Sequence, residues 1–90
     1  MDTQFTRGKI SDALFHLATA SQPLPQRAWD AYMIATQGTA RDGFESEYRA
    51  LDHIFGGIRP EEVTSRLTLD AARRGAEVLL EMYNCLMFKS

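Results

Sequence analysis

The sequence predicts an all-α protein, a small bundle of four to five helices that forms a single helical domain over residues 1–90. Stretches rich in proline and glycine or other turn-forming residues, at 21–25, 37–43 and 56–60, divide the chain into segments. Between them, apolar residues recur at intervals of three and four, which is typical of helices. No run of alternating β-branched residues indicates a strand.

The first helix is expected over residues 11–20, with Ser11 as its N-cap, because a serine hydroxyl can accept a hydrogen bond from an unpaired amide of the first turn. Its apolar face consists of Ala13, Leu14, Leu17 and Ala18. The preceding residues, 1–9, either lengthen this helix or form a loose N-terminal arm.

The second helix is expected to begin after Pro23 and to end at Gly38. Pro25 suits its first position, where the missing amide would have been unpaired in any case. Its small face allows a neighbouring helix to approach closely and comprises Ala28, Ala31, Tyr32 and Ala35.

The third helix has the clearest apolar pattern, with large residues at spacings of four, three and four. These residues are Phe44, Tyr48, Leu51 and Phe55. Gly56 is expected to stop the helix in the left-handed conformation, which glycine adopts without steric cost.

The last segment, 60–88, begins with Pro60 and two glutamates, which favour the positive end of a helix. Residues 64–68 are poor helix formers. We therefore predict a short helix, a break near Leu67, and a long terminal helix capped by Thr68; one continuous helix is the alternative.

Apolar residues cover more than half the circumference of the terminal helix at ~100° per residue. One face holds Ala72, Ala76, Leu79, Leu80, Tyr83, Leu86 and Met87, and a second strip holds Val78, Met82 and Cys85. A surface helix needs an apolar stripe of only ~100°. The helix is therefore central in the bundle or lies at a dimer seam. We expect a homodimer whose protein interface comprises Val78, Met82, Cys85, Leu86, Leu79 and Tyr83.

The composition is that of a folded domain, with 44% hydrophobic and 24% charged residues. A net charge of −2 gives no general attraction for nucleic acid, which is not an expected partner. The C-terminal apolar run is interrupted by polar residues and is too short to cross a membrane. A lone cysteine, Cys85, and the lack of a signal-like start indicate a cytoplasmic protein.

No catalytic, cofactor-binding or metal-binding residues are predicted, and no small-molecule substrate is expected. Asp12 and His16 are four residues apart, but a surface helical pair is the favoured interpretation over an acid/base site. Two histidines and one cysteine do not form a zinc pattern. Cys85 near a helix C-terminus lacks the surroundings that activate a thiol.

These observations predict a non-enzymatic protein-protein interaction module that acts as an adaptor, regulator or inhibitor by binding another protein. Trp29 and Met33 form an alternative partner patch, although core packing is the default interpretation for them. The alternative function is a small helical DNA-binding transcriptional regulator. It would use a basic region that comprises Arg59, Arg66, Arg73 and Arg74, but the acidic residues between these arginines favour pairing on a solvated surface.

Overall fold

The computed structural model describes residues 3–38, 41 and 43–88. Over these residues the chain forms helices and turns without a strand, so the predicted all-α fold is confirmed. The helices are α1 (Thr3–Thr19), α2 (Leu24–Thr36), α3 (Glu45–Phe55), the 3-10 turn η1 (Pro60–Glu62), α4 (Val63–Arg66) and α5 (Leu69–Phe88).

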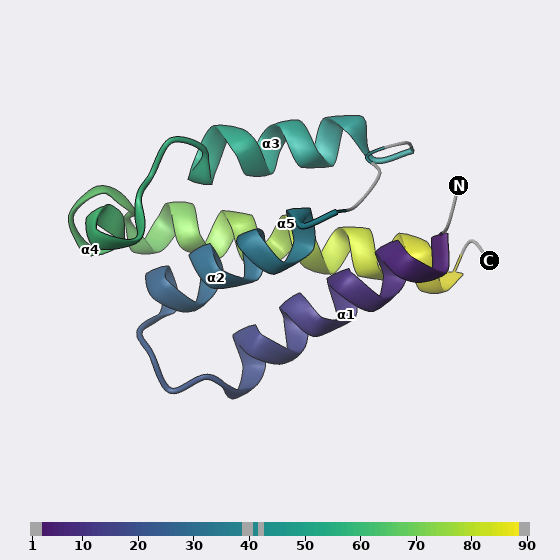
Figure 1. Ribbon diagram of the computed structural model, residues 1–90, viewed down its shortest axis with the longest axis horizontal. Coiled ribbons are helices and arrows are strands. Elements are labelled where there is room, and N and C mark those ends of the chain that lie inside the picture. The colour runs from purple at the N-terminus through teal and green to yellow at the C-terminus, as the bar shows by residue number, and fades with distance from the viewer. Residues whose placement is uncertain (1–2, 39–40, 42, 89–90) are drawn as a thin grey trace.

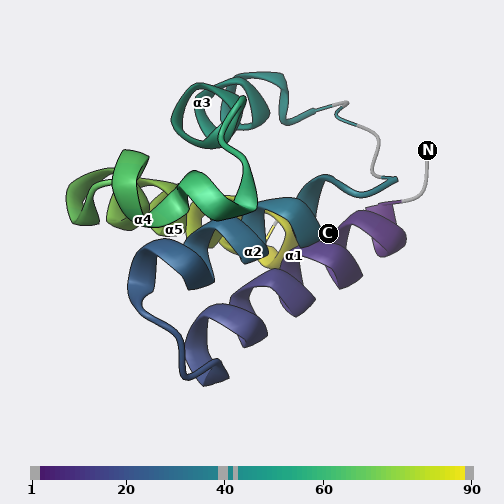
Figure 2. The same ribbon diagram turned by 60° about the vertical axis from the view of Figure 1, so that its left-hand side comes forward.

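Helix α5 is the central element of the bundle. α3 lies along one side of it, α1 and α2 lie along another, and α4 lies near its beginning (Figures 1 and 2). The start of α1 lies beside the end of α5, where a guanidinium nitrogen of Arg7 is 3.5 Å from the carbonyl oxygen of Leu86. The terminal helix is therefore central in the bundle, which is one of the two predicted arrangements.

Helix α1 begins earlier than the sequence indicated. Residues 3–9 form its first turns, so they are not a loose arm, and residues 1–2 lie outside the described residues. Ser11 is an exposed residue within the helix, and its predicted N-cap role is wrong. The physical reason is that Thr6 and Ile10 are buried and extend the core face of the helix by about two turns toward the N-terminus.

The small-residue face of α2 is buried as predicted. Ala28, Ala31 and Ala35 are fully enclosed, which lets neighbouring helices come close to the α2 backbone. Pro25 lies in the first turn.

Three of the four residues of the predicted core face of α3, Tyr48, Leu51 and Phe55, are buried, whereas Phe44 is half-buried and lies just before the helix. Gly56, however, does not adopt the left-handed conformation: its φ is −62°, and Gly57 has the positive φ of 79°. A β-carbon at Gly56 would lie 2.4 Å from the carbonyl oxygen of Asp52. Because glycine has no side chain, residue 56 leaves space for the last helical hydrogen bond. The chain then reverses its direction at residue 57.

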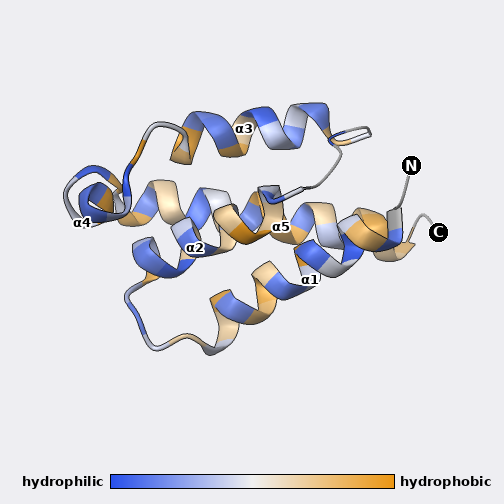
Figure 3. Ribbon diagram, viewed as in Figure 1, coloured by the Kyte–Doolittle hydropathy of each residue, from blue (hydrophilic) through white to orange (hydrophobic). Residues whose placement is uncertain are grey.

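The predicted break before the terminal helix is present. Leu67 is extended and buried between α4 and α5. The Thr68 hydroxyl accepts a hydrogen bond from the amide of Ala71 at 3.1 Å, which is the geometry of an N-cap. Hydrophobic segments recur along α5 between hydrophilic ones (Figure 3).

Candidate interaction surfaces

The strip predicted as the dimer interface is largely part of the core. Val78 and Met82 are 2% and 0% exposed, and Leu79 and Leu86 are also buried. Cys85 and Tyr83 are half-buried. The buried residues cannot offer a surface to a second chain, so this interface is corrected. The physical reason is that α3 lies against this side of α5 and covers it.

Neighbouring helices leave the other edge of the apolar surface of α5 exposed. Leu69, Leu80 and Met87 are 59%, 50% and 44% exposed, and Ala76 and Tyr83 beside them are half-buried. At ~100° per residue these five positions fall within a strip of about 60°. We call Leu69, Ala76, Leu80, Tyr83 and Met87 the α5 seam.

A groove runs between α3 and α5 on another side of the terminal helix. It consists of three adjoining hollows of about 480, 160 and 480 Å³. The hollows share lining residues, among them Ala50 and Arg74 at one junction and Glu81 at the other. We call this surface the α3–α5 groove; Ala50, Ile54, Val78 and Cys85 contribute its apolar lining.

The two ends of the α3–α5 groove carry opposite charges. Arg49, His53 and Arg74 line one end. Glu47 and Glu81 line the other, where Phe88 is 86% exposed. Within the described part of the chain, Arg49, His53 and Arg74 make no hydrogen bond or ion pair, so their donors are available to a ligand.

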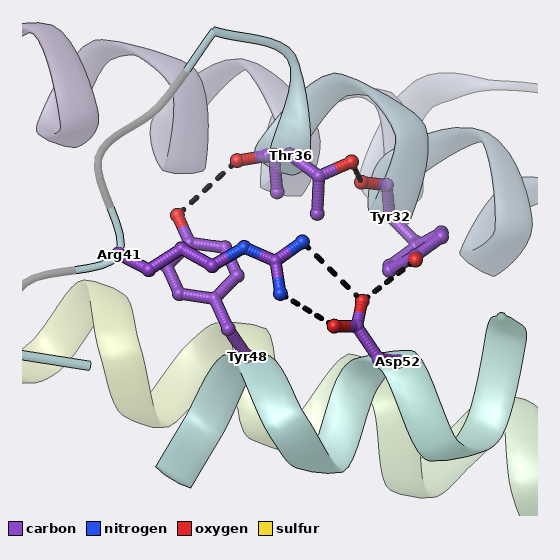
Figure 4. A network of polar contacts seen from close by, with 6 residues as sticks. Tyr32, Thr36, Arg41, Tyr48 and Asp52 are labelled. Carbon is purple, nitrogen blue, oxygen red and sulfur yellow. Dashed lines mark hydrogen bonds and ion pairs between the residues drawn. The ribbon is translucent and has the colours of Figure 1, made fainter. Parts of the chain in front are cut away.

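A polar cluster joins α2, α3 and the segment before α3 (Figure 4). The Tyr32 hydroxyl donates to a carboxylate oxygen of Asp52 at 2.8 Å. Both terminal nitrogens of Arg41 donate to the same carboxylate, and the guanidinium lies over the Tyr48 ring, 5.1 Å from its centroid. The cluster therefore holds the Arg41 side chain on α3 and links α3 to α2 through Asp52 and Tyr32.

The electrostatics of this cluster favour a structural role. Burial and the hydrogen bond to Asp52 raise the pKa of Tyr32 to about 12. Burial alone would raise the pKa of Asp52, but the hydrogen bonds from Arg41 and Tyr32 outweigh it and lower that pKa. At neutral pH the tyrosine is protonated and the carboxylate is charged and fully engaged, which does not suit a general base.

The histidine singled out from the sequence has a different partner. His16 Nε2 lies 3.3 Å from a carboxylate oxygen of Asp30 in α2, whereas Asp12 is exposed. This contact links α1 to α2.

The alternative partner patch is only partly on the surface. Trp29 is half-buried, and its indole Nε1 donates to the carbonyl oxygen of Ile58 at 3.1 Å. Met33 is 39% exposed. Trp29 thus holds the segment after α3 against α2, and only Met33 is prominent at the surface.

The basic residues do not form one continuous patch. Arg66 lies 3.4 Å from Glu62 in an i, i+4 ion pair, as the interleaved charges suggested. Arg74 lines the α3–α5 groove, and Arg73 lies on the α5 surface between the groove and the seam. The role of Arg74 with Arg49 and His53 was not predicted, because these residues belong to different helices.

Among the residues that the structure describes, no group of three or more His, Cys, Asp or Glu side chains is arranged to hold a metal ion. None of the helices in the described ranges has the length and apolar character needed to cross a membrane. In comparisons with known proteins, no family model, curated protein or solved structure matches this chain.

Proposed function

We propose that this chain is a non-enzymatic protein interaction module, of the adaptor, regulator or inhibitor class, and that its α3–α5 groove receives a helix of a partner protein. The observation that carries the proposal is the groove itself: a hollowed surface between two helices, with the guanidinium groups of Arg49 and Arg74 at one end and the carboxylates of Glu47 and Glu81 at the other. Helices that bind in grooves use an apolar face for affinity. Charges at the ends set their orientation.

The groove sets the length of the partner helix. α3 has 11 residues and is therefore about 16 Å long. A partner helix of about three turns would cover this length. Its apolar residues, at spacings of three and four, would contact Ala50 and Ile54.

The charges of the groove set the direction of the partner helix. The N-terminal end of a helix carries partial positive charge and the C-terminal end partial negative charge. The partner's N-terminus is therefore expected beside Glu47 and Glu81, and its C-terminus beside Arg49 and Arg74. Acidic side chains in its last turn would pair with these arginines.

The engaged state of Tyr32 and Asp52 supports the non-enzymatic part of the proposal, because these polar groups satisfy one another. Cys85, a free thiol at the groove's acidic end, fits a reducing cytoplasmic setting, which we propose as the site of action.

Selection from a displayed library of randomised helical peptides tests this function. The wild-type chain should enrich amphipathic helices with acidic residues near the C-terminus. An Arg49→Glu/Arg74→Glu variant should bind these peptides at least about tenfold more weakly, because like charges then meet at that end.

The matched control is Arg59→Glu/Arg66→Glu, which makes the same change in net charge outside the groove and should retain binding. A failure to enrich any helical peptide contradicts the proposal. If the enriched peptides bind equally well to the two double variants, the proposal is contradicted as well.

A further inference from the structure

The basic end of the α3–α5 groove has the features of an anion site. Among the described residues that line its hollow of about 480 Å³, none is acidic. These lining residues are Ser46, Arg49, Ala50, His53, Ile54 and Arg74. Arg49 and His53 are four residues apart and share one face of α3, whereas Arg74 lines the same hollow from α5. Two guanidinium groups that have no carboxylate partner in the described ranges therefore line one hollow.

The number of side-chain donors in this hollow favours phosphate over carboxylate. The Ser46 hydroxyl donates to Glu47 at 3.0 Å, so the available donors are the two guanidinium groups and the imidazole of His53. A single guanidinium engages both oxygens of a carboxylate. A phosphate monoester has three terminal oxygens and a charge of about −1.5 to −2 at neutral pH. It can therefore engage both arginines and His53 together, and it balances the charges of both arginines.

We propose that the basic end of the groove binds the phosphate of a phosphorylated serine or threonine in the last turn of the partner helix. This inference rests on the proposed function, because the direction of the partner helix places its C-terminal turn beside Arg49 and Arg74. The affinity of the partner then depends on whether this residue carries a phosphate.

The rest of the groove favours a phosphate carried by a helix over a free phosphorylated molecule. Glu47 and Glu81 line the adjoining hollow and repel a dianion from the middle of the groove. Ala50 and Ile54 are half-buried and offer apolar contacts beside the arginines. A free phosphorylated molecule engages only the polar donors, whereas a phosphorylated amphipathic helix also makes these apolar contacts.

Calorimetric titration with three forms of one peptide tests the site. The peptide is a helix selected by the groove, with serine, glutamate or phosphoserine at one position of its last turn. The phosphoserine form should bind about tenfold or more tightly than the glutamate form, because the phosphate engages both arginines. The glutamate form should bind more tightly than the serine form, as the proposed function requires.

Variants of the arginines test whether the hollow provides this gain. Arg49→Gln and Arg74→Gln should each remove most of the advantage of phosphoserine over glutamate, because each variant lacks one pair of donors. Arg73→Gln is the matched control and should keep the full advantage, since Arg73 is next to Arg74 but lines none of the three hollows. All three arginines are exposed, so the variants should keep the helical circular dichroism of the wild type.

The peptide series separates the two proposals. If phosphoserine binds no better than glutamate, while glutamate binds better than serine, the phosphate site is overturned and the helix-binding groove stands. An advantage of phosphoserine that persists in full in Arg49→Gln and Arg74→Gln also overturns the phosphate site.

A titration without any peptide tests the hollow by itself. Free O-phosphoserine at low ionic strength should shift the NMR signals of the Arg49 and Arg74 side chains, and acetate at the same ionic strength should shift them much less. If O-phosphoserine shifts neither arginine, the phosphate site is contradicted. If it shifts them but no form of the peptide binds, the hollow holds an adventitious ion only, and both proposals are overturned.

Discussion

A β-carbon at Gly75 of α5 would lie 2.3 Å from Cζ of Phe55, the last residue of α3. Phe55 also stacks on Tyr32 of α2, with ring centroids 5.0 Å apart, so its ring has little freedom to move aside. The absence of a side chain at 75 thus lets α3 lie directly on α5. This contact encloses Val78 and Met82 in the core and places α3 where it forms one wall of the groove.

Gly75→Ala is expected to destabilise the protein. Overpacking against Phe55 costs about 1–3 kcal/mol, and the better helix propensity of alanine recovers at most about 1 kcal/mol of it. Gly8→Ala is the control, because Gly8 has no atom within 4 Å of an added β-carbon and should gain about 0.5–1 kcal/mol. Urea unfolding measures both. If the two substitutions changed the free energy of unfolding equally, Phe55 would not restrict the size of the side chain at residue 75.

The charge of Asp52 is expected to make stability depend on pH. Its pKa in the fold lies below the ordinary value of about 3.9. Its contribution is therefore complete above about pH 5 and is lost as the pH falls from there through the lowered pKa. Urea unfolding should show that wild type and Asp52→Asn differ most near neutral pH and converge in acid. A difference that stays constant down to about pH 2 would contradict the assignment.

The break between α4 and α5 is expected to depend on Thr68. Thr68→Ala removes the N-cap hydroxyl and should cost about 1 kcal/mol, whereas Thr68→Ser keeps it and should be close to wild type. Thermal or urea unfolding of the two variants measures the difference. If residues 60–88 formed one continuous helix, alanine would be the better helix former and Thr68→Ala would stabilise the protein.

Apolar spacing predicted the helices and most of the core, because burial of a periodic face is a local property of the sequence. The uncovered edge of α5 was not predictable in the same way. The apolar sector is wider than one helix face needs, as predicted, but its exposed edge holds Leu80 and Met87 and not the predicted Val78 and Met82. The packing of Phe55 on Gly75 brings α3 against one side of α5, and a glycine within the helix was the available signal.

The polar residues that line the groove could be predicted to be exposed, but not to lie close together. Arg49 and His53 belong to α3 and Arg74 belongs to α5, so their proximity follows from helix packing. The N-terminal extension of α1 was missed for a similar reason: Thr6 becomes a core residue only because neighbouring helices cover it.

Calorimetric titration with a peptide selected by the groove tests the central claim most directly, through a charge-swap cycle. Arg74→Glu in the protein and acidic-to-lysine substitution in the peptide's last turn should each weaken binding by about tenfold or more. Combining the two should restore most of the affinity, because opposite charges meet again. If the combined change weakens binding by the product of the two separate effects, the peptide does not lie in the groove in the proposed direction.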